Sequence, residues 1–235
     1  MPVSRAGIVS HYNILRIRLK SRLRVGPRSR VVKPARLFTT GGSSIIIALM
    51  RIFTGIKLAE EARDKILKEL QPFKKAGPSI RWIDSGNIHL TLKFIGEADE
   101  AMTARITAAL ASAKIAIAPF GLRLSGFGKF PVGDDLHIFW AGVQDNPALL
   151  ALFTGIEEVL LPLGIERETR PFHPHLTLGR NKARTNFAAL FALLAQTQDL
   201  FLAEWPVAAF QLFSSRLTAA GSVYHVLKEI PLVQS

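Results

Sequence analysis

Two segments of the chain repeat the same four residues, His-Leu-Thr-Leu. The first copy begins at His89 and the second begins at His175, 86 positions later. Imidazole gains or loses a proton close to neutral pH, so a histidine can serve as a general acid or a general base. A threonine hydroxyl two positions later can hydrogen-bond to the oxygen atoms of a phosphate. Two such pairs predict a site at which two histidines act on one substrate.

Both copies lie in apolar segments that alternate in the manner of a β-strand. Because successive side chains of a strand point to opposite faces, His89 shares a face with Thr91, and His175 shares a face with Thr177. The leucines between them occupy the other face and can anchor each strand to a core. We therefore expect the two His–Thr faces to line one groove.

This set of residues suits the cleavage of a phosphodiester without a metal. A neutral imidazole can take a proton while a protonated imidazole gives one. The hydroxyls of Thr91 and Thr177 can hydrogen-bond a tetrahedral oxyanion between them. Arg180 lies five positions after His175 and adds a fixed positive charge with forked donors for phosphate.

The segment His173-Pro174-His175 allows a different interpretation, a metal site shared with His89, because imidazole is a common metal ligand. Neither motif contains a carboxylate, however, and hydroxyl groups suit phosphate better, so we expect no metal and no cofactor. His173 shares the face of His175 by strand alternation, although Pro174 can disturb that geometry. His173 could contact phosphate, hold the edge of the cleft or have no role. We favour a structural or incidental role.

Aromatic residues and the remaining histidines give weaker signals. Phe127 and Phe130, in the segment GFGKFP, could stack on a base at the mouth of the cleft. Packing in the core or in a turn is the alternative that we favour for both. His137 and His225 are not followed by a threonine two positions later, so we expect structural roles for them.

From Met50 onwards the chain alternates between strand-like and helix-like segments. We expect helices at 58–74, 99–114, 147–163 and 185–195, and strands at 50–56, 79–83, 88–96, 173–180, 206–217 and 222–232, with FGLRLSGFGKF and LHIFWAGV as two further strands. Each half of this body supplies strands, helices and one His-Leu-Thr-Leu segment. The pattern predicts an α+β fold that arose by duplication, with two lobes of pseudo-twofold antiparallel sheets and outer helices around a central cleft.

The formal charge of +12 comes almost entirely from the first 49 residues. That stretch contains ten basic residues and no acidic one, whereas the rest of the chain carries 20 basic and 18 acidic residues. The body is therefore nearly neutral, and its charge alone does not indicate a protein that binds polyanions. The absence of cysteine excludes disulfides, thiolate metal sites and cysteine nucleophiles. It also fits a reducing compartment, so we expect a cytoplasmic protein.

The basic extension at residues 1–49 has three interpretations. It could be a transit-like presequence, a basic arm that grips RNA, or upstream sequence wrongly included in the coding region. We favour the third, because MRIFTGIKLAEEAR from Met50 reads as a natural start, with a strand followed at once by a helix. We therefore expect the extension to be either disordered or a start-site artefact, and the domain to span 50–235. The apolar run at 43–50 is far shorter than the roughly 18 residues of a membrane span.

From Met50 to the end, the chain resembles the two-histidine (2H) phosphoesterase superfamily, and most of all its RNA 2′,3′-cyclic phosphodiesterase branch, historically called 2′-5′ RNA ligase. The resemblance rests on the segments MRIFTGIKLAEE, IRWIDSGNIHLTLKFIGE, ERETRPFHPHLTLGR and FQLFSSRLTAAGSVYHVLKEIPL. It implies a bilobal α+β fold with both H-x-T strands lining a central cleft. It also implies hydrolysis of a 2′,3′-cyclic phosphate at an RNA end to a 2′-phosphate, with a weak reverse reaction that joins RNA ends through a 2′-5′ bond.

The same resemblance implies roles for five residues. His89 corresponds to the donor that protonates the leaving 3′ oxygen, and His175 corresponds to the acceptor that activates water. Thr91 and Thr177 correspond to residues that hold the non-bridging phosphate oxygens, and Arg180 to an arginine that contacts phosphate. The implied partner is RNA with a 2′,3′-cyclic phosphate end or a small cyclic nucleotide, and we expect a monomer with no membrane partner.

Two other functions stay open at this point. A related enzyme could act on a small cyclic nucleotide phosphate or on ADP-ribose cyclic phosphate, because loops around the cleft set the size of the substrate. An RNA-binding module could keep the cleft without doing chemistry. The two intact H-x-T motifs argue against that module, because binding alone does not require two titratable histidines.

Overall fold

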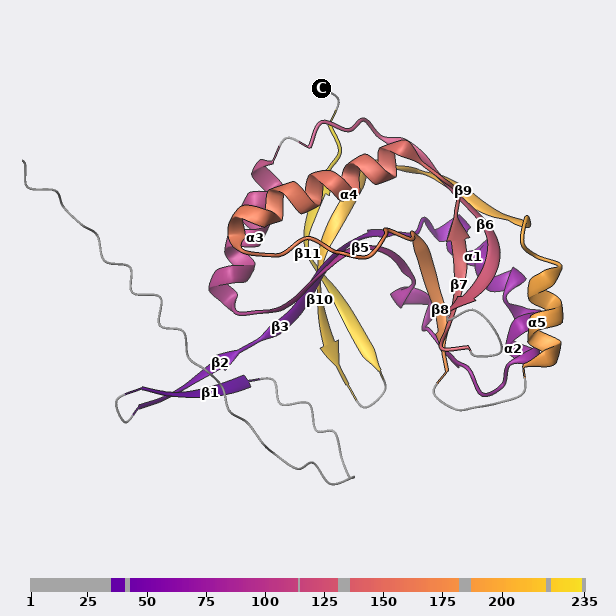
Figure 1. Ribbon diagram of the computed structural model, residues 1–235, viewed down its shortest axis with the longest axis horizontal. Coiled ribbons are helices and arrows are strands. Elements are labelled where there is room, and N and C mark those ends of the chain that lie inside the picture. Colours follow the sequence, from indigo (N-terminus) through magenta and orange to yellow (C-terminus); the bar gives the residue numbers. More distant parts are fainter. Residues whose placement is uncertain are drawn as a thin grey trace, which may run out of the picture. The chain divides into compact units, whose positions relative to one another are not determined.

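The computed structural model describes residues 35–40, 43–113, 115–130, 136–181, 187–218 and 221–233 (Figure 1). Its elements in chain order are β1 (Ala35–Thr40), β2 (Ser43–Ala48), β3 (Met50–Lys57), α1 (Glu60–Glu69), α2 (Gln71–Ala76), β4 (Arg81–Trp82), the 3-10 turn η1 (Ser85–Asn87), β5 (His89–Ala98), α3 (Glu100–Ser112), β6 (Phe120–Phe130), β7 (Ile138–Val143), α4 (Pro147–Leu160), the 3-10 turn η2 (Leu161–Leu163), β8 (His175–Arg180), α5 (Ala188–Ala195), β9 (Phe201–Val207), β10 (Ala209–Leu217) and β11 (Ser222–Pro231).

Nine strands form one curled antiparallel sheet in the order β11-β10-β3-β5-β8-β7-β6-β9, with β4 beside β8. At the middle of the sheet, β5 and β8 are joined through a single residue pair, Leu90 and Leu176. The sheet therefore consists of two halves of four main strands that meet at one narrow contact. The predicted α+β class with antiparallel strands is confirmed.

The prediction that each half of the chain builds its own lobe is wrong. The last strands of the chain, β10 and β11, pair with β3 and complete the half of the sheet that contains β5. The other half combines β6, β7 and β9 with β8. Hydrogen bonding between the N-terminal and C-terminal strands, which residue types alone do not reveal, decides this arrangement.

The helices also cross between the halves of the sheet. In chain order α1 lies between two strands of the β5 half, yet it packs against β9 in the other half, next to α2 and α5 (Figure 1). Conversely α4 follows β7, yet it packs against β5 and α3. Because α1 and α4 each cover the half to which they do not belong in chain order, the two halves share helices, and the buried apolar residues form one continuous core.

Local sequence explains two further differences from the predicted elements. The helix expected at 58–74 is two helices, α1 and α2, because Pro72 lacks an amide proton and fits only the first turn of a helix. Strand β9 was missed because Pro206 lies within it. Proline is tolerated there because β9 is an edge strand. On the outer side of an edge strand no neighbouring strand accepts a backbone N–H, so its absence costs no ladder hydrogen bond.

The basic extension is only partly described by the structure. Residues 1–34 lie outside the described residues, while β1 and β2 pair as an antiparallel hairpin. The start of the domain at Met50 therefore stays a prediction. No helix within the described ranges is long and apolar enough to span a membrane.

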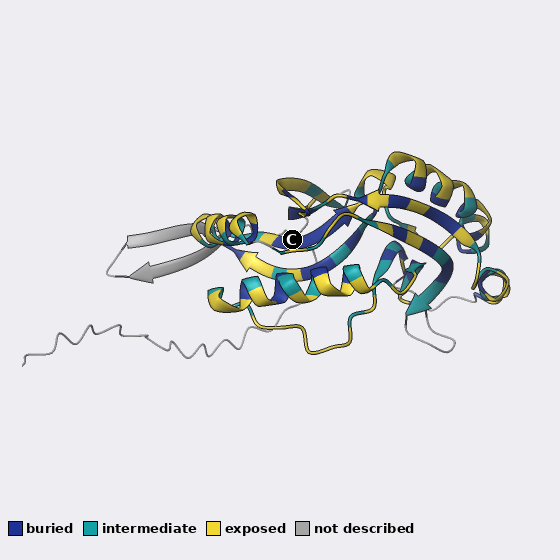
Figure 2. Cartoon of the chain, turned by 90° about the horizontal axis from the view of Figure 1, so that it is seen from above, coloured by how far each residue is buried: buried dark blue, intermediate teal, exposed yellow. Residues whose placement is uncertain are grey.

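The burial pattern of the two central strands confirms the predicted alternation. Four leucines of β5 and β8 are at most 4% exposed, and they are Leu90, Leu92, Leu176 and Leu178. The intervening side chains are only partly buried. Figure 2 shows the same contrast over the molecule, with buried strands inside and helices whose outer faces are exposed. The leucines fix both strands to the core and leave their other face open for chemistry.

Candidate active site

The two His–Thr pairs lie on neighbouring strands. Because Leu90 and Leu176 pair in an antiparallel ladder, continuing the register by one residue in each direction sets His89 beside Thr177 and Thr91 beside His175. All four side chains occupy the face opposite to the buried leucines. The structure thus brings together the four residues that the sequence singled out, with a local two-fold relation between the pairs.

Each histidine is oriented by a backbone carbonyl two positions earlier. The Nδ1 atom of His89 lies 2.7 Å from the carbonyl oxygen of Asn87, and the Nδ1 atom of His175 lies 2.7 Å from that of His173. A carbonyl oxygen only accepts hydrogen bonds, so Nδ1 carries a proton in both rings. The Nε2 atoms are therefore the ring nitrogens available for acid–base chemistry, and Nε2 of His89 lies 3.1 Å from the hydroxyl of Thr91.

Aromatic rings enclose the first histidine. The ring centroid of His89 lies 4.8 Å from that of Phe53, 5.7 Å from that of Phe213 and 5.0 Å from that of Tyr224. Burial lowers the pKa of His89, and the positive charge of Arg180 lowers it further, against the opposing effect of the Asn87 carbonyl. The sequence did not reveal these rings, because apolar aromatics on β3, β10 and β11 look like ordinary core residues.

The second histidine has a more open surrounding. The ring of Phe130 meets that of His175 edge-on at 5.2 Å. Burial again lowers the pKa of His175, opposed by the carbonyl of His173, while the charges of Arg180 and His173 lower it further. Free of substrate, both imidazoles therefore favour the neutral form more than an ordinary histidine does.

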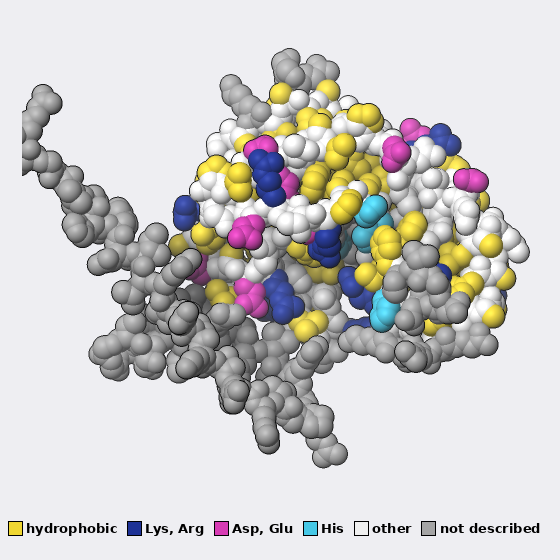
Figure 3. Space-filling view, in the orientation of Figure 1, with side chains coloured by type: hydrophobic (Ala, Val, Ile, Leu, Met, Phe, Trp, Pro, Cys, Tyr) yellow, Lys and Arg dark blue, Asp and Glu magenta, His cyan; other side chains and the backbone are white. Residues whose placement is uncertain are grey.

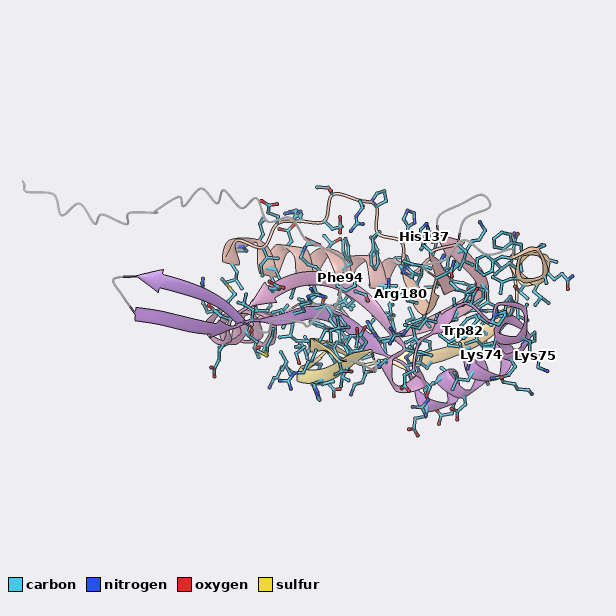
Figure 4. All side chains as sticks on the ribbon, turned by 90° about the horizontal axis from the view of Figure 1, so that it is seen from below. Lys74, Lys75, Trp82, Phe94, His137 and Arg180 are labelled. Carbon is cyan, nitrogen blue, oxygen red and sulfur yellow. The ribbon has the colours of Figure 1, made fainter. Side chains whose placement is uncertain are left out.

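Arg180 acts on both histidines from the end of β8. Its side chain is exposed, and its position in the register is directly opposite Arg81 of β4. In the view of Figure 4, Arg180 lies between Phe94 of β5 and Trp82 of β4. Figure 3 shows histidine side chains with Lys and Arg side chains beside them near the middle of one face. Two neighbouring arginines at this end of the site attract an anion, and sequence analysis had singled out only one of them.

A buried ion pair supports the site from the core. The ammonium of Lys93 lies 2.7 and 2.8 Å from the two carboxylate oxygens of Glu157 and 2.8 Å from the carbonyl oxygen of Glu166. Lys93 and Glu157 are 5% and 3% exposed. A β-bulge at Leu92 turns the lysine inwards, where strand alternation would have pointed it outwards. The pair joins β5 to α4 and to the segment that leads into His173.

The remaining predicted residues have different outcomes. His173 is exposed and contributes its carbonyl to His175. The ring of Phe127 is 4% exposed and packs against Phe73 and Phe139, so the core role is the one that the structure shows. This burial agrees with the packing role that the sequence analysis favoured for Phe127. Phe130, in contrast, lies beside His175. Within the described ranges, no three His, Asp or Glu side chains are grouped so that they could hold a metal ion.

Comparison with known proteins gives consistent matches over this body. Residues 57–218 match the sequence profile of the 2′-5′ RNA ligase superfamily. An RNA 2′,3′-cyclic phosphodiesterase of Methanocaldococcus jannaschii is 33% identical over 180 residues, which are 77% of this chain and 99% of that protein. An RNA 2′,3′-cyclic phosphodiesterase of Thermotoga maritima is 31% identical, with 77% of this chain and 94% of that protein covered.

Solved structures show the same fold. The crystal structure of TT0787 from Thermus thermophilus aligns with a TM-score of 0.68 at 28% identity, over 79% of this chain and all of that one. The structure of Escherichia coli LigT in complex with 3′-AMP aligns with a TM-score of 0.63 at 25% identity, over 79% of this chain and 99% of that one.

Proposed function

Because this chain belongs to the 2′-5′ RNA ligase superfamily, in which its relatives above are RNA 2′,3′-cyclic phosphodiesterases, we propose that it hydrolyses 2′,3′-cyclic phosphates at RNA ends to 2′-phosphates without a metal. The observation that carries the proposal is the pairing of Leu90 with Leu176, because it sets two His–Thr pairs on one face of the sheet. The reverse reaction, which joins RNA ends through a 2′-5′ bond, belongs to the same proposal.

In the proposed reaction, water attacks the phosphorus while Nε2 of His175 takes a proton from it. The bond between phosphorus and the 3′ oxygen breaks, and Nε2 of His89 protonates that oxygen. The product is a 3′ hydroxyl beside a 2′-phosphate. The hydroxyls of Thr91 and Thr177 hydrogen-bond the non-bridging oxygens as negative charge builds up in the transition state. Arg180 supplies fixed positive charge.

The lowered pKa of His89 has to be reconciled with its role as donor. Burial favours the neutral ring in the free enzyme. A bound phosphate anion has the opposite effect, because a negative charge nearby stabilises the imidazolium. Binding of the substrate therefore favours the protonated form of His89, which is the form that can act as a donor.

The substrate could also be a mononucleotide. LigT of E. coli has been solved with 3′-AMP, a ligand with a single base and a single phosphate. A small cyclic nucleotide would offer the same cyclic phosphate to the His–Thr face, so it is the second candidate substrate.

A product assay tests the proposed function. We expect an oligonucleotide with a 2′,3′-cyclic phosphate end to be converted to the 2′-phosphate, at the same rate with and without a chelator of divalent ions. Chromatography against synthetic 2′- and 3′-phosphate standards identifies the product. Formation of the 3′-phosphate would contradict the assigned leaving group. Loss of activity with chelator and its return with a divalent ion would contradict the metal-free reaction.

The pH dependence provides a second test. Activity requires one neutral and one protonated imidazole, so kcat/KM should follow a bell-shaped profile. Because the pKa of each histidine is lowered, both limbs for the free enzyme should lie at lower pH than for an ordinary histidine. The basic limb of kcat, which reports the complex with substrate, should lie at higher pH than that of kcat/KM. A kcat/KM that stays constant across the pH range in which histidines titrate would exclude the two-histidine mechanism.

A further inference from the structure

Two arginines lie next to each other at the end of the site where β8 meets β4. Arg81 pairs in register with Arg180, and both side chains are exposed. The Cα atoms of paired residues on neighbouring antiparallel strands are about 4.5–5.5 Å apart, so the two side chains start from neighbouring points of the sheet. Two positive charges this close repel each other, and bound anions offset that repulsion. The pair is therefore a candidate site for more than one phosphate.

A β-bulge turns Arg180 towards the reacting residues. Strict alternation from His175 would put Arg180 on the core face, together with Leu178. The register of β8 against β7 skips Leu178, however, and sets Gly179 opposite the fully buried Phe139. Arg180 then projects from the face that carries His175. Its charge lowers the pKa of His175, in agreement with that direction.

Arg81 projects from the same face of the sheet. The ring of its neighbour Trp82 packs edge-on against Phe139, with the centroids 5.3 Å apart, and so faces the core. Because successive side chains of a strand alternate, Arg81 points to the opposite face, which is that of the His–Thr pairs. Both arginines of the register pair therefore face the substrate side.

The guanidinium of Arg81 lies on the side of the site that contains the first histidine. A Cβ atom at Gly221 would lie 2.9 Å from Nη2 of Arg81, so the guanidinium lies against the turn that precedes β11. The carbonyl oxygen of the next residue, Ser222, accepts a hydrogen bond of 2.9 Å from the side-chain amide of Asn87. The carbonyl of Asn87 in turn holds Nδ1 of His89. Arg81 and His89 thus lie against the same end of the β10–β11 hairpin.

The proposed reaction determines on which side the RNA chain leaves the site. Water attacks the phosphorus from the side of His175, and His89 protonates the 3′ oxygen on the opposite side. The 3′ oxygen belongs to the terminal ribose, so this ribose lies on the side of His89. The next phosphodiester of the chain is attached to the 5′ oxygen of the same ribose and leaves the site on that side, where Arg81 holds its guanidinium.

We propose that Arg81 binds the phosphodiester that joins the last two nucleotides of the RNA, while Arg180 binds the cyclic phosphate. The inference rests on the proposed function, because the cyclic phosphate must lie between the two His–Thr pairs for the next one to reach Arg81. The planar guanidinium can donate two parallel hydrogen bonds to two phosphate oxygens. A cyclic mononucleotide has no such phosphodiester, so this contact selects RNA over the mononucleotide.

Two oligonucleotides with the same sequence and the same terminal 2′,3′-cyclic phosphate test the proposal. In one of them the last internucleotide linkage is a methylphosphonate, which carries no charge. We expect kcat/KM of the wild type to be about 10-fold lower for the neutral linkage, because the loss of a hydrogen bond to a charged group has an effect of this size. A methylphosphonate several linkages further towards the 5′ end should leave kcat/KM unchanged.

The variant Arg81→Gln should abolish the difference between the two substrates. It should lower kcat/KM about 10-fold for the charged substrate, and the neutral linkage should then cause no further loss. For the charged substrate, the slope of log kcat/KM against log salt concentration should become shallower by about 0.7, the contribution of one phosphate contact on a single strand.

Two other arginine variants serve as comparisons. Arg180→Gln should lower kcat/KM for both substrates and preserve their ratio, because both carry the cyclic phosphate. Arg123→Gln is the matched control, since Arg123 is an exposed strand arginine whose guanidinium lies 4.9 Å from the ring centroid of Phe201, near the far edge of the sheet. It should change neither kcat/KM nor the ratio.

The outcomes separate the two proposals. If the wild type hydrolyses both substrates equally well, or if Arg81→Gln keeps the wild-type ratio between them, the phosphodiester contact of Arg81 is refuted and the proposed function stands. If the wild type hydrolyses neither substrate, the proposed function is refuted, and the contact of Arg81 with it.

Discussion

Replacement of either motif histidine by alanine is expected to reduce kcat on a cyclic-phosphate oligonucleotide by about 10²- to 10⁴-fold, the range that general acid–base catalysis supplies. The physical reason is that Nδ1 of each ring is held by a backbone carbonyl and Nε2 faces the substrate, so alanine removes the proton transfer itself. Steady-state kinetics on the purified His89→Ala and His175→Ala proteins measure the effect. Binding of the 2′-phosphate product should persist, because Arg180 remains.

The double variant and one control sharpen this prediction. If the two histidines act in one reaction step, removing both should cost little more than removing one, since residues that work as a unit are strongly non-additive. His225→Ala is the control, because His225 is exposed on β11 and alternates to the face opposite Tyr224, which contacts His89. Near-normal turnover by both single variants would refute the assignment of the active site.

The second large effect concerns stability. Lys93→Met removes the ammonium that pairs with the buried carboxylate of Glu157 and should lower the free energy of unfolding by about 3–5 kcal/mol. That is a large part of the total stability of a typical domain, about 5–15 kcal/mol. Urea unfolding followed by circular dichroism measures the change.

Two companion variants separate burial of a charge from loss of a contact. Lys93→Met combined with Glu157→Leu should recover most of the lost stability, because two apolar residues replace the pair and no unpaired charge is left. Arg167→Met breaks an ion pair with Glu158 of similar length, 2.6 Å, but both side chains are about half exposed, so the cost should be no more than about 1 kcal/mol. If Lys93→Met and Arg167→Met lowered the free energy of unfolding equally, burial would not determine how much an ion pair contributes to stability.

The chemistry of the site was more accessible from the sequence than its architecture. A repeated His-x-Thr in alternating segments is enough to predict which side chains share a face, and the buried leucines on both strands agree with that prediction. Periodicity says nothing about which strands become neighbours. The pairing of β10 with β3 depends on hydrogen bonds between residues that are more than 150 positions apart, such as Gln211 and Gly55.

Residues that break the regular pattern were the hardest to place. Strict alternation along the strand would put Lys93 on the face of His89 and Thr91, but the bulge at Leu92 moves it into the core. Arg81 lies in a strand of two residues and becomes part of the site only through its register with Arg180. Trp140 looks like any buried tryptophan until its position opposite Thr177 is known.

The return of β10 and β11 to β3 has a consequence for biosynthesis. Strands β3 and β5 leave the ribosome early, but their half of the sheet lacks its outer strands until the last segment of the chain has been translated. Neither half can become a stable intermediate of its own, because each needs helices and strands supplied from distant parts of the sequence. Long-range pairing of this kind slows folding, since the closure of a long loop precedes any gain from the contacts. A nascent chain that stops short of Ser222 would therefore expose the edge of β10 and become a target for chaperones or proteases.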